Sequence, residues 1–156
     1  MAGPVPEDVF ARHYRDIYRY LARMTGRPDV ADDLSQDVFL RVVRALRNGG
    51  PIGHERGWVF SIARNVLVDR GRAERRQPSG PAAAEPAAAA TQALAFGLAE
   101  ALAGLPEDDR DVFLLKEVGG LTYEEISAAR ACTVEAVRSR LFRTRVSLRK
   151  TLAGGR

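Results

Sequence analysis

The chain has 156 residues, of which 46% are hydrophobic and 28% are charged, and its net charge is +4. This is enough apolar material for a folded core and too much for a chain that is disordered throughout. No apolar run approaches the roughly 18 residues that cross a bilayer, so we expect no membrane insertion. A single cysteine, Cys132, and two histidines, His13 and His54, exclude an intrachain disulfide and a convincing zinc set. We therefore expect a cytoplasmic protein without a metal or cofactor.

Three helices are predicted in the first half of the chain. Residues 8–26 carry apolar side chains at helical spacing, and Gly26 marks their end. Residues 28–50 begin with Asp29 as the expected N-cap and run from acids to arginines, which is the order that the helix dipole favours. Residues 55–76 combine an apolar stripe with a strongly basic tail. No strand pattern competes with these helices.

A change of composition follows the third helix. The segment "RQPSGPAAAEPAAAATQ" is rich in proline and alanine and contains no large apolar side chain, so it has nothing to bury against a core. We predict a flexible linker over residues 77–92. It would join two units, residues 1–76 and residues 93–156.

The second unit is also predicted to be helical. Residues 93–104 and 107–118 form two short helices, and a long final helix starts at residue 134. Between them, Thr122 and Glu125 have the spacing of a capping box, in which each side chain satisfies a free backbone donor at a helix start. The expected fold class is all-α, with two small helical domains.

The last two helices form a recognisable pattern. At 100° per residue, Val134, Val137, Leu141 and Leu148 fall on one side of the final helix, and small polar residues with arginines fall on the other. A capped helix, a short turn and a helix of this kind form a helix-turn-helix, whose second helix enters the DNA major groove. The alternative, an ordinary solvated basic face, explains the charge but leaves the capping box and the turn without a purpose.

Longer motifs carry a family resemblance. The segments "DVADDLSQDVFLRVVRAL" and "WVFSIARNVLVDRGRAERR" resemble region 2 of bacterial sigma factors. The segment "ALAGLPEDDRDVFLLKEVGGLTYEEISAARACTVEAVRSRLFRTRVSLRK" resembles region 4. With these two regions and no domain between them, the chain is similar to the extracytoplasmic-function group of the sigma-70 family. The resemblance implies a non-enzymatic protein that binds core RNA polymerase and promoter DNA, commonly with an anti-sigma factor as partner.

The resemblance also assigns roles to individual residues. Region 4 would read the duplex −35 element through Glu135, Ala136, Arg138, Ser139, Arg140 and Arg143. Region 2 would hold the melted −10 strand through Ser61, Arg64, Asn65 and Arg72. The surface for core polymerase would include Asp33, Gln36 and Asp37. Arginines along the backbone and polar groups for unstacked bases are what single-strand binding requires.

The turn before the final helix and the function both leave alternatives open. Arg130 and Ala131 stand where the family usually has an apolar residue and then glycine, and a left-handed Ala131 would cost on the order of 1 kcal/mol. Trp58 is expected to be a core anchor and Cys132 a buried or half-buried turn residue. The alternative function is a stand-alone helix-turn-helix regulator at an operator, which leaves the acidic second helix and the "IARN" segment without a role. An enzyme has little support, because no nucleophile has a neighbouring histidine and acid.

Overall fold

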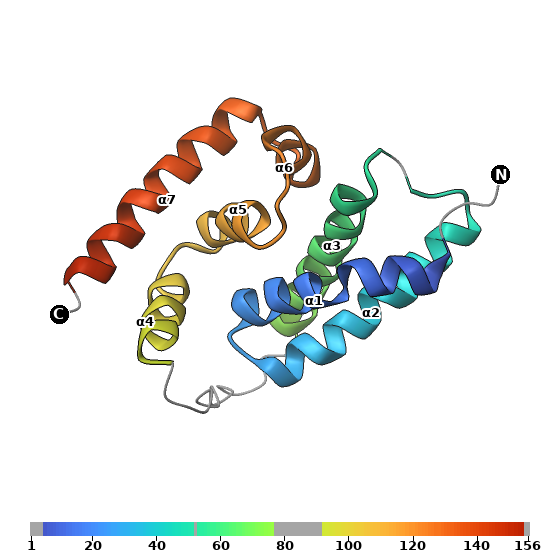
Figure 1. Cartoon of the computed structure of the whole chain (residues 1–156), viewed down its shortest axis with the longest axis horizontal. Coiled ribbons are helices and arrows are strands. Elements are labelled where there is room, and N and C mark those ends of the chain that lie inside the picture. The colour runs from blue at the N-terminus through green and yellow to red at the C-terminus, as the bar shows by residue number, and fades with distance from the viewer. Residues whose placement is uncertain (1–4, 52, 77–91, 155–156) are drawn as a thin grey trace.

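The described residues fold into helices joined by short turns, as the sequence predicts. The computed structural model describes residues 5–51, 53–76 and 92–154. These residues form seven α-helices and no strand (Figure 1). The helices are α1 (Pro6–Thr25), α2 (Pro28–Arg47), α3 (Glu55–Arg76), α4 (Gln92–Ala103), α5 (Glu107–Glu117), α6 (Tyr123–Arg130) and α7 (Val134–Gly154). Within those ranges no helix is long and apolar enough to span a bilayer.

Helices α1, α2 and α3, here called the N-terminal group, pack around an apolar centre. Val9 and Leu21 of α1, Val38 of α2 and Val59 of α3 are all fully buried. Burial of one such side chain contributes about 1.5–3 kcal/mol relative to exposure, so the predicted apolar stripes account for the packing. Trp58 is half buried and packs against this core, which confirms its predicted role as an anchor.

The start of α2 differs from the prediction that Asp29 is its N-cap. The helix begins at Pro28, with Arg27 in the cap position and without a side-chain cap hydrogen bond. Proline is favoured at the first helical position because its missing N–H would be unsatisfied there in any case. Asp29 lies inside the first turn, where its carboxylate pairs with Arg27 at 2.8 Å.

The turn between α6 and α7 keeps a left-handed residue without using glycine. The predicted capping box is present: Thr122 Oγ1 accepts from the Glu125 N–H, and Glu125 accepts from the Thr122 N–H. The helix ends at Ala131, which has φ 53° and ψ 47°. An L-residue in this conformation costs roughly 1 kcal/mol. Cys132 follows, half buried as predicted, and its N–H donates to the Ser127 carbonyl at 3.1 Å.

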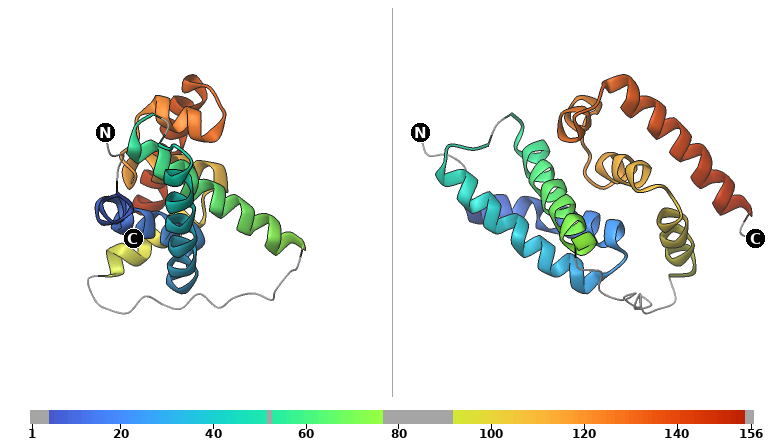
Figure 2. Two further views of the ribbon diagram at one scale, coloured as in Figure 1. Left: turned by 90° about the vertical axis from the view of Figure 1, so that its right-hand side faces the viewer. Right: turned by 180° about the vertical axis from the view of Figure 1, so that it is seen from behind.

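Helices α4 to α7, here called the C-terminal group, lie against the N-terminal group (Figures 1 and 2). Helix α5 contacts α1, α6 contacts α3, and α4 contacts α1. The expected linker, residues 77–92, lies outside the described residues except for Gln92, which begins α4. The division into residues 1–76 and 93–156 stays a prediction. The contact between the groups brings segments together that are far apart in the sequence.

Candidate nucleic-acid interface

The final helix, α7, presents the two faces that its sequence predicts. Val137, Leu141 and Leu148 are buried in the C-terminal group, whereas Val134, at the start of the helix, is only half buried. Thr133 Oγ1 accepts a hydrogen bond from the Ala136 N–H at 3.0 Å, which satisfies a free donor at the helix start. The predicted −35 residues divide into four that are exposed and two that are half buried: Glu135, Arg138, Ser139 and Arg143, and Ala136 and Arg140.

The three arginines on this face have different surroundings. Arg138 lies over the ring of Tyr123, with its guanidinium carbon 5.6 Å from the ring centroid. Arg140 donates from Nη1 to Oδ1 of Asp109 at 3.0 Å, so α5 holds its guanidinium. Arg143 is exposed. A base edge in the major groove would therefore meet Arg143 most directly, whereas Arg140 would first have to leave a carboxylate.

The predicted −10 residues lie along α3 but do not share one environment. Asn65 and Arg72 are exposed. Ser61 is half buried, and its hydroxyl donates to the backbone carbonyl one helical turn earlier at 2.9 Å. Arg64 turns toward α5, where its Nε–H donates to Oδ2 of Asp111 at 2.9 Å, and only 21% of its side chain is exposed. The side chain of Arg64 therefore lies in a different environment from the side chains of Asn65 and Arg72, which are open to solvent.

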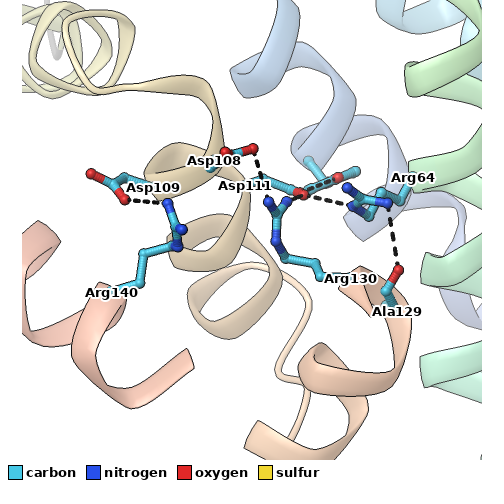
Figure 3. Close-up of polar contacts among 8 residues, drawn as sticks. Arg64, Asp108, Asp109, Asp111, Ala129, Arg130 and Arg140 are labelled. Atoms are coloured by element: carbon cyan, nitrogen blue, oxygen red, sulfur yellow. Dashed lines mark hydrogen bonds and ion pairs between the residues drawn. The ribbon is translucent and has the colours of Figure 1, made fainter. Parts of the chain in front are cut away.

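Asp111 is the centre of a buried polar cluster between the two helical groups (Figure 3). Its side chain is 5% exposed and accepts hydrogen bonds from Tyr20, Arg64 and Arg130. Arg130 also donates to Asp108 at 2.9 Å. Removing a carboxylate from water is strongly unfavourable unless it is paired and hydrogen-bonded. These donors offset that penalty, and they come from both groups.

The contacts within the Asp111 cluster shift the pKa values of several of its members. Burial, and after it the charge of Asp111, raise the pKa of Tyr20 well above its ordinary value. The hydrogen bond from Arg130 lowers the pKa of Asp108. Burial alone would lower the pKa of Arg130, but the two carboxylates outweigh it and raise that pKa. At neutral pH, Tyr20 is therefore a neutral donor and Arg130 a fixed cation.

Sequence reasoning missed Tyr20, Asp111 and Arg130 as members of one site. Tyr20 lies on the buried stripe of α1, and Asp111 belongs to the acid-rich stretch before α6. Nothing in residue spacing connects two positions that are 91 residues apart. The cluster exists only because α1, α3, α5 and α6 meet.

The N-terminus of α3 carries a second polar cluster. Glu55 accepts two hydrogen bonds from Arg12, each 2.8 Å long. Its Oε2 also lies 2.7 Å from Nε2 of His13. The hydrogen bond from Arg12 is the main reason that the pKa of Glu55 falls to about 2. The next residue, Arg56, donates to the backbone carbonyl of Gly119. This end of α3 is therefore tied both to α1 and to the turn after α5.

The predicted polymerase-binding residues lie on one open side of α2. Asp33, Gln36 and Asp37 are all exposed. Leu40 continues the same side and is 62% exposed. Sequence analysis missed Leu40, although its spacing from Asp33 and Asp37 places it on their face of the helix. An exposed leucine beside two acids forms a surface suited to a partner with apolar and basic side chains.

The C-terminal part of α3 is basic and stands away from the other helices (Figure 2, left). Arg72 and Arg75 are exposed, and Arg70 pairs with Glu74 at 2.9 Å. Cations on a projecting helix can follow a nucleic-acid backbone, which carries a regular series of negative charges.

A capped helix-turn-helix together with a second basic helix is typical of an all-helical DNA-binding protein. Residues 9–77 match the family Sigma-70 region 2, and residues 96–148 match Sigma-70, region 4. The chain is 35% identical to the RNA polymerase sigma factor CarQ of Myxococcus xanthus over 94% of its own length and 88% of that protein. It belongs to the extracytoplasmic-function group of the sigma-70 family.

Further relatives agree with this membership. The chain is 32% identical to the ECF RNA polymerase sigma factor SigE of Mycolicibacterium smegmatis over 97% of its length, and it spans 63% of that longer protein. Among solved structures, CnrH in complex with the cytosolic domain of CnrY is 28% identical, with a TM-score of 0.75 over 97% of this chain and 89% of CnrH. The sigma factor RpoE from Bartonella quintana, solved with the anti-sigma factor NepR, shares the fold, with a TM-score of 0.77 over 96% of this chain and 98% of that one at 23% identity.

Proposed function

We propose that this chain binds core RNA polymerase and directs it to promoter DNA, with residues 1–76 acting as region 2 and residues 93–156 as region 4. The observation that carries the proposal is the occurrence of both sigma regions, in this order, in one chain. A stand-alone operator-binding regulator needs only the second of them and leaves α1, α2 and α3 without a role. The protein acts by binding, in the cytoplasm, and not by catalysis.

The C-terminal group reads the duplex −35 element through the exposed face of α7. Arg143 can grip a guanine edge with two hydrogen bonds, and Glu135 can accept from a cytosine amino group. The ring of Phe142, which is 70% exposed, lies beside Arg143 and can contact a thymine methyl group. Arg138 and Arg140 support this face from its edges, where their charge lies near phosphates.

The N-terminal group holds the unpaired −10 strand along α3. Asn65 is exposed and can hydrogen-bond an extruded base, and Arg72 lies further along the same helix where a backbone phosphate can follow. Arg64 adds a cation close to Asn65 once it is released from Asp111. Base contacts and phosphate contacts together give both specificity and affinity.

Core polymerase binds the open side of α2. Asp33 and Asp37 provide charge for basic side chains of the polymerase, and Leu40, one turn beyond Asp37, provides an apolar anchor beside them. We extend the proposal to an anti-sigma partner, because CnrH, to which both helical groups of this chain are similar, is found in complex with the cytosolic domain of CnrY. Leu40 and Phe142 are exposed apolar side chains that such a partner can cover.

The test is transcription in vitro with core polymerase over a library of promoter sequences. We expect transcripts from a subset of templates that share a −35 and a −10 element. Loss of this activity in Asp37→Arg, with DNA binding by the free chain retained, would support the role of α2. Failure of the wild-type chain to support initiation on any template, together with tight binding to a palindromic operator, would favour the regulator instead.

A further inference from the structure

Arg140 lies at the border of the face of α7 that would enter the major groove, here called the reading face. The reading face consists of the exposed residues Glu135, Ser139, Phe142 and Arg143. At roughly 100° per residue, Arg140 is about 60° round the helix from Arg143, on the side of the buried Thr144. Residues three apart are neighbours on a helix surface, so a long side chain at position 140 can turn toward the groove or toward its edge.

Asp109 of α5 fixes which way Arg140 turns. Nη1 of Arg140 donates to Oδ1 of Asp109 at 3.0 Å (Figure 3). The Asp109 side chain is 19% exposed, and α5 packs against α7. Solvent therefore screens this ion pair less than a pair on an open surface. Both residues belong to the C-terminal group, so the pair does not depend on how that group meets the N-terminal group.

The position of the Arg140 guanidinium decides what it can bind. An arginine inside the major groove grips a guanine edge with two hydrogen bonds, whereas an arginine at the edge of the groove meets a phosphate of any sequence. The bond to Asp109 uses one of the guanidinium nitrogens, so the others stay available for a phosphate. It also holds the side chain back from the bases that Arg143 would read.

We propose that Asp109 is a positioning residue that determines base specificity: it keeps Arg140 at the border of the reading face and leaves Arg143 as the arginine that reads guanine. This inference rests on the proposed role of α7 at the −35 duplex. Without Asp109, Arg140 turns into the groove and adds a second guanine-reading fork beside the first.

The test is selection of randomised duplexes of about 20 base pairs by the full-length chain alone, followed by sequencing. Selection with Arg143→Ala identifies the position that Arg143 reads. Asp109→Ala should add a guanine preference of at least about fivefold at a neighbouring position, which is the lower end for a specific base contact. The added preference should disappear when Arg140→Gln is combined with Asp109→Ala.

Glu107→Ala is the matched control. Glu107 is exposed in the same first turn of α5, and its replacement changes the net charge by the same amount. This variant should keep the wild-type preference. Asp109→Glu retains a carboxylate and should keep it as well. Circular dichroism verifies folding, and Asp109→Asn, which removes the charge at nearly constant shape, gives a second measurement of the same change.

The salt dependence of binding distinguishes positioning from a structural role. In the wild-type background, Arg140→Gln should weaken binding equally on all duplexes and reduce the slope of log K against log salt by about 0.9, the value for one phosphate contact. In the Asp109→Ala background, the same substitution should weaken binding most on the duplexes with the added guanine. A purely structural ion pair would give loss of affinity in every variant and no new base preference.

The outcomes separate this inference from the proposed function. An unchanged base preference in both Asp109→Ala and Asp109→Asn, a new preference that survives Arg140→Gln, or the same new preference in Glu107→Ala would each overturn the inference. So would the absence of any base preference in wild type and variants. The proposed function is tested by transcription with core polymerase, and its failure there would leave the selection results standing.

Discussion

The hydroxyl of Tyr20 in α1 donates a hydrogen bond to the carboxylate of Asp111 in α5, 91 residues further along the chain. Tyr20 is fully buried, so this bond joins the two helical groups at a point without solvent. Arg64 reaches the other oxygen of the same carboxylate. The relative position of the groups is therefore specified by polar atoms that must be satisfied inside the protein.

Tyr20→Phe tests this bond, because it keeps the ring and removes only the hydroxyl. The free energy of unfolding should fall by about 1–2 kcal/mol, since the buried carboxylate loses one donor while Arg64 and Arg130 remain. Urea unfolding followed by circular dichroism measures the change. Tyr18→Phe, at a half-buried position on the same helix, is the control and should have an effect below about 0.5 kcal/mol. Equal effects of the two substitutions would show that the bond to Asp111 contributes nothing.

The Glu55 site makes stability depend on pH in the acid range. Because its folded-state pKa of about 2 lies below the ordinary value of 4.5, the carboxylate stabilises the fold above that ordinary value. This stabilisation is lost as the pH falls from 4.5 to about 2. Glu55→Gln should therefore lower the free energy of unfolding by on the order of 1–3 kcal/mol at pH 7, and the difference from wild type should shrink through the acid window. A difference that does not vary with pH would contradict this account.

The turn between α6 and α7 offers a stabilising substitution. Ala131→Gly should raise the free energy of unfolding by about 1 kcal/mol, because glycine adopts the left-handed conformation without the Cβ clash. Ala128→Gly, inside α6, is the matched comparison and should lower stability by about the same amount. Thermal unfolding of the two variants beside wild type gives opposite shifts in Tm if the strain at Ala131 is real.

Thr144 is a second site for stabilisation. Within the described residues, its Oγ1 is buried without a hydrogen-bond partner. Thr144→Val replaces that hydroxyl by a methyl group, so the free energy of unfolding should rise by about 1–2 kcal/mol. Thr144→Ser keeps the hydroxyl and removes the methyl group, so it should be destabilising. If the valine variant is less stable than wild type, the hydroxyl has a partner that the geometry does not reveal.

Separate roles of the two helical groups in DNA binding predict different defects in two variants. Arg143→Ala should weaken −35 selection about 10- to 100-fold, which is the range for loss of one bidentate base contact. Asn65→Ala should impair promoter opening while leaving duplex binding largely intact. Band-shift assays measure the first step and permanganate reactivity of the −10 thymines measures the second, with Arg15→Ala on the surface of α1 as control. Equal loss of both steps in each variant would count against separate roles.

Local structure could be predicted from the sequence because its causes are local. Apolar spacing specified the helices, Gly26 ended α1, and the spacing of Thr122 and Glu125 specified a capping box. The prediction of Asp29 as an N-cap was wrong because the neighbouring proline occupies the first helical position more favourably. Leu40 could have been found by extending the same helical spacing to an apolar residue on a polar face.

The all-helical class, the helix-turn-helix and the surface of α7 with its exposed Arg143 could be inferred from the order of residues, since each depends on residues within a few turns of one another. Only the packed molecule shows that Arg64 faces Asp111 and that Gly57 lies beneath Glu125. Those relationships join residues 47 or more positions apart. They arise because a buried carboxylate must find donors wherever the packed helices bring them, and residue spacing carries no information about which helices meet.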